Sequence, residues 1–277
     1  MPNNTPTYWE AAGVSLHTYA QSIETLSGLG PPKLRGENVV VPLHPGSRFI
    51  QKVPDSNTLT LAMWLRGVVS SAGVAEVNET REQYMRNWND LVRLMWRNGE
   101  QFDLTKRFYD GTNPSVISAT AKAEYAGGLE PTFLGKSAAK CTIDLTLADP
   151  FFYSDSLFSA SLVNGNNMID VPGTAESLAI FIRINGSRTN TTIRNVTNGI
   201  EFTYPNAVAS TEYLDVDVKN YTARHKPAGG PEYDASTRII HFGGPQWLKL
   251  EPGANTLNVS STSGTGVITI QARGAWV

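Results

Sequence analysis

The chain has 277 residues, a formal net charge of −2 and only 17% charged residues. This length is enough for two ordinary hydrophobic cores of about 120–150 residues each. The low charge offers neither the clustered Lys and Arg needed to bind nucleic acid nor a polybasic segment for a membrane surface, so neither class of binding protein is expected.

The start of the chain carries no export signal. Residues 1–6 have neither the basic beginning nor the apolar run of a secretory signal peptide. No apolar stretch in the sequence approaches the ~20 residues that a bilayer span requires. We therefore expect a protein that is made in a cytoplasm, is not exported by a signal peptide and does not insert into membranes.

The first predicted elements are strands interrupted by an irregular arm. Residues 9–17 suit a first strand, and a short segment follows around residues 23–26. Residues 28–56 form a Pro- and Gly-rich arm, in which Pro31 and Pro32 can neither continue a helix nor sit centrally in a sheet. Short strands are predicted inside the arm at residues 39–42 and 49–53, on either side of a turn at residues 45–47.

The clearest strand covers residues 58–66. Leu59 and Leu61 begin an apolar face of period two, while the other face carries Trp64 and is partly apolar as well. Such a strand is either covered on both sides or meets a neighbouring subunit, and the sequence leaves both open. Candidate oligomer-interface residues are therefore Leu59, Leu61, Trp64, Pro31 and Pro32.

One amphipathic helix is predicted, over about residues 80–98. Thr80 and Gln83 fit a capping box at its start, and Gly99 suits the position after its end. An apolar stripe at helical spacing predicts that the helix packs on a sheet and does not line a cofactor pocket. The stripe consists of Tyr84, Trp88, Leu91, Val92 and Met95.

Three more strands are expected in the first half, at residues 102–106, 116–126 and 141–147, with a turn at 110–114 and a loop at the glycines 127–128. The last strand contains Cys141, the one cysteine of the chain. Cys141 alternates in phase with apolar residues, so we interpret it as a small buried hydrophobe and not as a nucleophile. A single thiol also excludes an internal disulfide.

The pattern changes at residues 149–153. Beyond them the sequence predicts many short strands separated by turns, which is typical of an antiparallel sandwich, and Asn198-Gly199 is a strong hairpin signal. We therefore expect a mainly β protein with a β-rich α+β domain over residues 1–150 and a β-sandwich over residues 151–277. The predicted strands of the sandwich are 179–184, 191–196, 200–204, 212–219, 238–242, 247–250, 256–259 and 267–273.

The search for chemistry finds no catalytic, cofactor-binding or metal-binding site. The four histidines lack the spacing of metal ligands. Asp215 and Asp217 share one face of a strand about 7 Å apart, a separation that would permit an acid–base pair. The alternating apolar residues around them predict that this face is solvated, so the interpretation as an enzyme of the cell wall rests on this pair alone.

Trp247 is the candidate contact for a sugar, because aromatic rings can stack on pyranose faces. It follows a glycine pair and a proline and is out of phase with Leu248 and Leu250. Placement in a core or an interface is favoured over exposure to a glycan.

Four segments carry a resemblance to a known family: residues 13–16, 59–64, 147–153 and 247–257. Over essentially its full length the chain resembles the distal tail proteins of long-tailed bacteriophages with non-contractile tails. The resemblance implies a ring-forming first domain and a galectin-like second domain. The runs with which galectins bind sugar, His-x-Asn-Pro-Arg and Trp-Gly-x-Glu, do not occur, so sugar binding is not carried over with the fold.

The resemblance also implies an assembly. The first domains would form a homohexameric ring, sheet edge to sheet edge, around a channel for DNA and the tape measure protein, and the second domains would project outward. The ring would join the tail tube to the baseplate or tip proteins of the virion. The chain itself would be made in the host bacterial cytoplasm. The alternative is a carbohydrate-binding module of the tail tip that recognises a glycan on the host surface.

Overall fold

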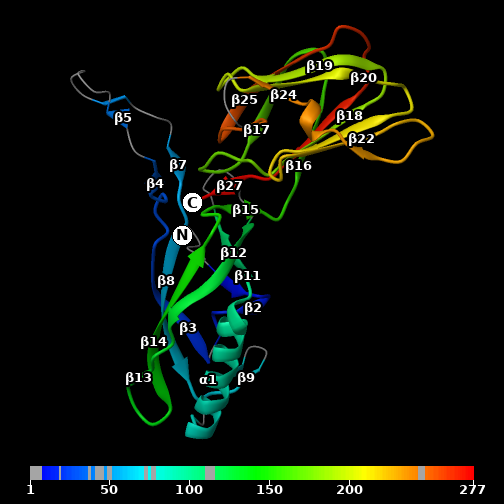
Figure 1. Cartoon of the computed structure of the whole chain (residues 1–277). Helices are drawn as coiled ribbons and strands as arrows, with labels where there is room; N and C mark the ends of the chain where they lie inside the picture. Colours follow the sequence, from blue (N-terminus) through cyan, green and yellow to red (C-terminus); the bar gives the residue numbers. More distant parts are fainter. Residues whose placement is uncertain are drawn as a thin grey trace, which may run out of the picture. The chain divides into compact units, whose positions relative to one another are not determined.

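Figure 1 shows the computed structural model of the chain. It divides into two compact units, residues 1–152 with Val277 and residues 153–276. The structure describes residues 8–18, 20–36, 39–40, 47–48, 52–71, 74–75, 79–109, 116–242 and 247–277. Within these ranges, no helix combines the length and the apolar character needed to cross a bilayer.

The first unit is built on one antiparallel sheet with the strand order β2-β1-β11-β12-β14-β8-β3, and β13 adds to β14. The longest pairing joins β14 to β8 over ten residues without a register shift, and it aligns their apolar faces. The strands are β1 (Tyr8–Ala11), β2 (Val14–Ser15), β3 (Gln21–Ser27), β8 (Asn57–Arg66), β11 (Phe102–Phe108), β12 (Ile117–Gly128), β13 (Thr132–Phe133) and β14 (Ala138–Leu147).

Three two-stranded pairs complete the first unit. The pairs β4 (Leu34–Arg35) with β7 (Val53–Pro54) and β5 (Val39–Val40) with β6 (Ser47–Arg48) lie in the arm, and β9 (Ser70–Ser71) pairs with β10 (Val74–Ala75). The pair β4–β7 therefore forms a β-ribbon that continues β3 and β8, as Figure 1 shows. Most of the predicted strands 39–42 and 49–53 and of the turn 45–47 falls outside the described residues.

The predicted single strand over residues 9–17 is wrong, because the chain turns back on itself there. β1 and β2 pair as a hairpin with Glu10 opposite Ser15. The two turn residues, Ala12 and Gly13, have φ of 49° and 78°. Positive φ at both central residues is the signature of a type I′ turn, the usual connection of two-residue hairpins. The sequence did not predict this turn, because alanine is uncommon at the first central position of a type I′ turn.

The predicted helix is confirmed, with an earlier end. α1 (Arg81–Trp96) begins at Thr80, whose hydroxyl accepts a hydrogen bond of 3.1 Å from the backbone N–H of Gln83. The backbone N–H of Thr80 donates to the carbonyl of Gly67 and not to the Gln83 side chain, whose amide donates to Asn87, so only half of the capping box forms. The helix stops before Gly99 because Arg97 and Asn98 already have φ of 36° and 55° inside the 3-10 turn η1 (Arg97–Gly99).

α1 packs on β8 and β12, as its apolar stripe predicts (Figure 1). Tyr84, Leu91 and Met95 are buried, while Trp88 and Val92 lie half-buried at the edge of the contact. α1 is the only α-helix among the described residues, and the predicted mainly β architecture with one main helix is confirmed.

The glycines 127–128 do not open a loop. They end β12, which carries a bulge between Tyr125 and Gly127. Gly128 has φ of 89°, and a Cβ there would lie 2.2 Å from the carbonyl oxygen of Thr142. The glycine pair therefore lets β12 follow β14 closely, and the loop begins one residue later. The predicted turn at 110–114 lies outside the described residues.

The second unit is a sandwich of two antiparallel sheets, with orders β16-β26-β18-β21-β22-β23 and β17-β25-β19-β20-β24. Their inner faces share one hydrophobic core, to which Ile182 contributes from the first sheet and Phe202 from the second. The predicted hairpin at Asn198-Gly199 is confirmed between β19 and β20. β15 (Phe152–Ser154) pairs with β12 and with β27 (Ala275–Trp276). The sandwich elements are β16 (Phe158–Leu162), β17 (Gly165–Val171), β18 (Ile180–Asn185), β19 (Arg188–Asn195), β20 (Glu201–Val208), β21 (Tyr213–Asp217), β22 (Thr222–Lys226), β23 (Tyr233–Asp234), η2 (Ser236–Arg238), β24 (Ile240–Phe242), β25 (Gly253–Ser260) and β26 (Ile268–Ala272).

Two details of the sandwich differ from the sequence prediction. Residues 247–250 form no strand, and only Leu250 makes an isolated bridge, to Ser177. The predicted strand at 238–242 begins at Ile240 because the 3-10 turn η2 takes up the residues before it.

Candidate functional site

The order of strands in the first unit's sheet ends in β2 on one side and in β3, the longer of the two, on the other. Among the described residues β3 pairs only with β8, and a bulge between Ile23 and Thr25 interrupts the ladder. Glu24, exposed at this bulge, accepts a hydrogen bond of 2.9 Å from Lys140 Nζ, and this bond holds the pKa of Glu24 below its usual value. An open strand edge is a template for pairing with another chain, so β3 is a candidate contact for a second subunit.

The described residues of the arm next to this edge form no buried core. None of residues 28–36 is buried, and Leu34 is 59% exposed. The base of the arm is fixed, since Asn57 Nδ2 donates to the carbonyl of Gly28 at 2.6 Å and Asp55 N donates to that of Lys33 at 2.7 Å. A ribbon that buries nothing within its own chain gains stability when another surface covers it.

The five candidate interface residues fall into two groups. Leu59 and Leu61 are both 0% exposed in the core of the first unit, which leaves them no surface for a second copy. Trp64 lies half-buried on the opposite face of β8, with Lys140 Nζ 4.3 Å from its ring centroid. Pro31 is exposed and Pro32 half-buried. The interface proposal therefore rests on Trp64 and the two prolines.

The sheet face opposite the apolar core face is polar. Thr60 donates to Asp144 at 2.6 Å, and the hydroxyls of Thr105 and Thr120 lie 2.9 Å apart. Three ion pairs cross the strands of this face: Lys122–Asp103, Arg107–Glu10 and Lys140–Glu24. Cations and carboxylates neutralise one another there, so the face is hydrated and carries little net charge.

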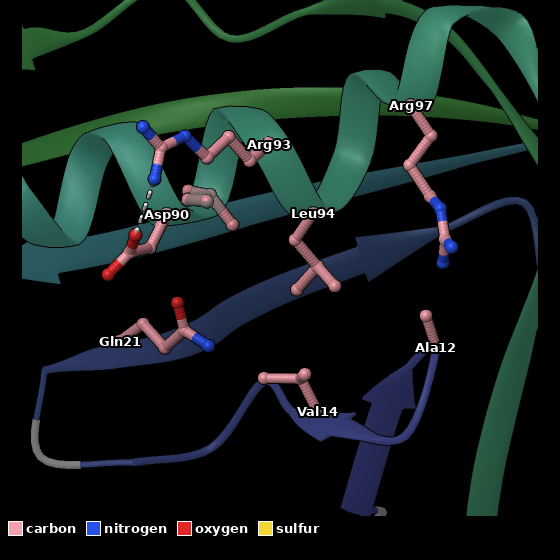
Figure 2. A pocket seen from close by; sticks show the side chains of 8 residues that line it. Ala12, Val14, Gln21, Asp90, Arg93, Leu94 and Arg97 are labelled. Atoms are coloured by element: carbon pink, nitrogen blue, oxygen red, sulfur yellow. Dashed lines mark ion pairs between the residues drawn. The ribbon is translucent and has the colours of Figure 1, made fainter.

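A surface hollow of about 440 Å³ lies between the end of α1 and the β1–β2 hairpin (Figure 2). Val14 and Leu94 provide apolar surface, and Arg93, Arg97 and Asp90 add charge at its side. Asp90 and Arg93 face each other at 3.8 Å and are largely exposed. This hollow offers contact area but no pair of groups positioned for acid–base chemistry.

Asp215 and Asp217 are engaged in separate structural contacts. Asp215 forms a two-bond ion pair with Arg183, with both N–O distances 2.6 Å. Asp217 accepts hydrogen bonds from the backbone N–H and the side-chain amide of Asn220 and holds the turn after β21. A carboxylate occupied in this way is a poor acid or base, which weakens the interpretation as an enzyme.

The histidines do not gather into a metal site. Within the described ranges no group of three or more His, Cys, Asp or Glu side chains could hold an ion. His225 is buried between the hydroxyls of Tyr204 and Tyr233, each 2.8 Å from Nδ1, and the Glu212 carboxylate, 3.1 Å from Nε2. Burial is the main cause that raises the pKa of Tyr204 to about 12. His44 lies outside the described residues.

Cys141 is 4% exposed, and burial raises the pKa of its thiol to about 11. We expect the native protein at pH 8 to react with an aromatic disulfide reagent at least about 100-fold more slowly than the unfolded chain, because thiolate is the reacting form. Absorbance of the released thiolate measures the rate, and the same reaction in guanidinium is the control. Equal rates in both conditions would contradict the buried placement.

Lys106 is a perturbed group that the sequence did not reveal. It is 6% exposed on the core side of β11, and burial lowers its pKa to about 8. Its Nζ donates to the carbonyl oxygen of Val277 at 2.7 Å and lies 4.4 Å from the ring centroid of Phe152. These partners compensate the charge of Lys106 within the fold.

Trp247 is 5% exposed. Its ring stacks on His241 at 5.4 Å and meets the edge of Tyr221 at 6.2 Å. A buried ring offers no open face to a pyranose, so a glycan contact at Trp247 would require the surrounding side chains to move.

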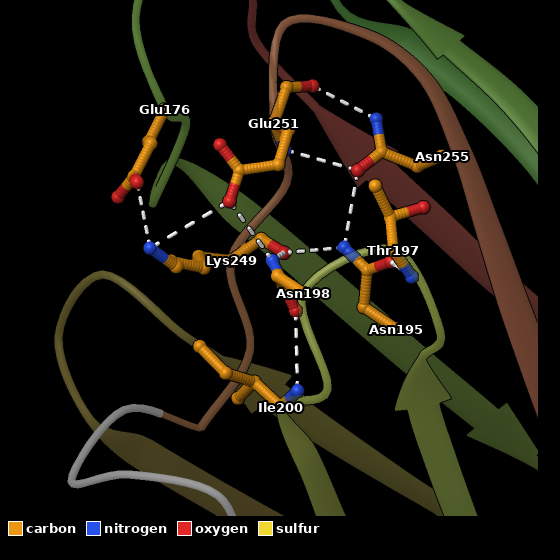
Figure 3. Close-up of polar contacts among 8 residues, drawn as sticks. All are labelled: Glu176, Asn195, Thr197, Asn198, Ile200, Lys249, Glu251 and Asn255. Atoms are coloured by element: carbon orange, nitrogen blue, oxygen red, sulfur yellow. Dashed lines mark hydrogen bonds and ion pairs between the residues drawn. The ribbon is translucent and has the colours of Figure 1, made fainter.

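The segment after Trp247 is tied down by a buried polar network (Figure 3). Asn255, 1% exposed, donates to the carbonyls of Glu251 and Gly253 and accepts from the backbone of Glu251 and the amide of Asn195. Asn195 in turn donates to the carbonyl of Lys249 at 2.9 Å. Lys249 Nζ lies 2.6 Å from Glu176 Oε1. The resemblance in residues 247–257 thus falls on a structural element and not on a binding site.

Comparison with known proteins gives structural matches alone. No protein-family model matches the sequence, and no curated protein matches it. The crystal structure of the SPP1 Dit protein, described as a paradigm of the hub adsorption apparatus of phages that infect Gram-positive bacteria, matches with 14% identity and a TM-score of 0.60. The match covers 99% of this chain and 100% of that one. The chain therefore shares the fold of that protein.

Two structures of the phage p2 baseplate in its activated conformation match less closely. The one with Ca is 9% identical, covers 97% of each chain and has a TM-score of 0.44. The one with Sr is 11% identical, covers 96% of this chain and 97% of that one, and has the same TM-score of 0.44. A likeness at this level carries no argument about the chain.

Proposed function

We propose that the chain is a structural virion protein, the hub at the distal end of a non-contractile phage tail. The observation that carries this proposal is the shared fold along the full length of both the chain and the SPP1 Dit protein. The proposed location is the tail tip of the virion, after synthesis in the cytoplasm of the host bacterium. We propose no enzymatic role, since the two candidate acids are engaged in structural contacts.

The assembly that we propose is a homohexameric ring, built by the first unit. Its support is the open edge of β3 together with the arm beside it, whose residues 28–36 are not buried. When two different patches on identical subunits contact each other, repetition of this contact closes a ring if the rotation between neighbouring subunits permits it. The polar, charge-balanced face of the sheet suits the wall of a channel through which DNA and the tape measure protein pass, because such a wall must not hold a polyanion. The tail tube and the tip or baseplate proteins are the proposed neighbours along the axis.

Electron microscopy of the purified protein tests this proposal directly. We expect closed rings with sixfold symmetry in negative stain and a matching mass in mass photometry. Single copies at micromolar concentration, together with a native tail that carries only isolated copies, would overturn it. Rings of another order would correct the stoichiometry and leave the hub in place.

The arm supplies a separate prediction. Leu34→Glu is expected to raise the concentration at which half of the chains are in rings at least about tenfold, because covering an exposed leucine contributes about 1.5–3 kcal/mol. Leu157→Glu, at a leucine that is 53% exposed against 59% for Leu34, is the matched control and should leave the rings unchanged. Mass photometry across a dilution series measures both. An unchanged ring in the Leu34 variant and after replacement of residues 30–55 by a short linker would refute a clasping arm.

A further inference from the structure

One side of α1 is apolar although the described residues of the first unit leave it partly open. Four apolar side chains recur along this side at intervals of three and four residues, which places them on one face of the helix over a length of about 17 Å. They are Met85, Trp88, Val92 and Trp96, and we call them the outer stripe. The outer stripe runs beside Tyr84, Leu91 and Met95, which are buried where α1 packs on the sheet. α1 is thus apolar over a wider arc than its contact with β8 and β12 requires.

The two ends of the outer stripe are its exposed residues. Trp96 is 57% exposed and Met85 is 43% exposed, while Trp88 and Val92 between them are half-buried. Tryptophan is a large apolar side chain that is enriched where interfaces gain most of their binding energy. A continuous apolar stripe that ends in an exposed tryptophan therefore indicates a docking surface.

β13 extends this surface at the start of α1. The Phe133 side chain is 51% exposed, and its ring centroid lies 5.7 Å from that of Tyr84 and 5.9 Å from the guanidinium carbon of Arg81. Leu134, the next residue, is 50% exposed. A partner that lies along the outer stripe would therefore reach Phe133 at one end and Trp96 at the other.

The charge around the outer stripe is positive. Over residues 81–97 four exposed arginines stand against two exposed carboxylates, a net charge of +2. They are Arg81, Arg86, Arg93 and Arg97, against Glu82 and Asp90. The ion pairs Arg86–Glu82 at 2.6 Å and Arg93–Asp90 at 3.8 Å are largely exposed and therefore weak. Two copies of α1 would set like charges against each other, whereas an acidic partner would be attracted.

We propose that the outer stripe docks an amphipathic helix of another protein, one that carries acidic residues beside its apolar face. The apolar side chains of this helix cover Trp96 and Met85 and pack on the half-buried residues between them. Its carboxylates face the arginines of α1. Because the occupant is a different protein, this surface is additional to the contacts between copies that we propose at β3 and the arm.

The test uses the full chain and two synthetic peptides of about 18 residues, each held helical by a hydrocarbon staple because free peptides of this length are only marginally helical. Both peptides carry leucines on one face, flanked by glutamates in one peptide and by lysines in the other. Fluorescence anisotropy measures binding. We expect the glutamate helix to bind saturably and, at low salt, at least about tenfold more tightly than the lysine helix.

Variants of the chain locate the contact. Trp96→Ala should weaken binding of the glutamate helix at least about tenfold, and Met85→Ala about 3–10-fold. Met168→Ala, at an exposed methionine of the second unit, is the matched control and should leave the affinity unchanged. Arg86→Glu combined with Arg93→Glu should remove the preference for the glutamate helix.

Several results would overturn the proposal. Absence of saturable binding excludes a docked helix, equal affinity for the two helices excludes an acidic partner, and unchanged affinity in Trp96→Ala excludes this surface. Loss of rings in Trp96→Ala would assign the outer stripe to contacts between copies, and binding to anionic lipid vesicles but to neither helix would assign it to a membrane. Trp96 is exposed at the end of α1, so its variant is expected to fold. A wild type that binds the glutamate helix but forms no rings would refute the ring and leave this inference standing.

Discussion

Asn255→Ala is expected to lower the free energy of unfolding of the second unit by about 2–4 kcal/mol. The side chain makes four hydrogen bonds, and three of them satisfy the backbone of Glu251 and Gly253 around the turn at Pro252. Alanine would leave these half-buried backbone groups without the partners that Asn255 provides. The amide of Asn195, which is 0% exposed, would lose its bond to Asn255 as well.

The measurement is urea unfolding followed by tryptophan fluorescence, because Trp247 and Trp276 are both buried in the second unit. The matched control is Asn258→Ala. Asn258 lies on the same strand, β25, but is half-buried, and its amide donates only to Asn166 at 2.7 Å on the surface. We expect the control to change stability by less than about 1 kcal/mol. Equal losses in the two variants would mean that the network does not hold the turn.

The sequence revealed elements whose burial follows a regular period. β8, α1 and β14 were predicted because their apolar residues recur at every second position or at helical spacing, and in all three the predicted faces are the buried ones. Their length makes such a pattern hard to produce by chance. The change of pattern at residues 149–153 likewise lies beside the boundary between the two units.

Elements with few buried residues escaped prediction. β22 buries only Ala223 and His225, and β17 only Ile169 and Val171, so neither shows a convincing apolar face. Residues 247–250 are the opposite case, because a strand was predicted there and none forms. They contain Lys249 between two leucines, which suggests alternation, yet all four residues are buried in an irregular segment. Glu176 pairs with the Lys249 ammonium group there, and the Asn195 side chain donates to the Lys249 carbonyl.

The candidate surfaces could be predicted only in part. The arm was visible from its prolines and glycines, which are local signals. The hollow lined by Phe181, Arg183 and Gln271 was not, because these residues come together through the pairing of β18 with β26, two strands that lie far apart in the sequence. The alternation in β21 did predict that Asp215 faces outward, but no sequence signal named Arg183 as its partner.

Gly67→Ala is expected to destabilise the first unit by about 2–4 kcal/mol, the upper range for overpacking. A Cβ on Gly67 would lie 2.1 Å from the carbonyl oxygen of Thr80 and 3.0 Å from the backbone nitrogen of Tyr84. Both atoms belong to the start of α1. Gly67 itself cannot retreat, since its N–H donates to the carbonyl of Ser137 at 2.7 Å and its carbonyl accepts from the N–H of Thr80 at 3.0 Å.

The helix must therefore move away from the sheet to admit one methyl group. Thermal unfolding monitored by tryptophan fluorescence measures the loss, with Trp88 on α1 as a local reporter. Gly127→Ala is the matched control: its Cβ would meet nothing within 4 Å, and its stability should change by less than about 0.5 kcal/mol. If both variants unfold alike, the close approach of β8 to the start of α1 is not what holds the helix. If only Gly67→Ala loses stability and rings are lost with it, ring formation depends on the position of α1 over β8, the strand that pairs with the free edge β3.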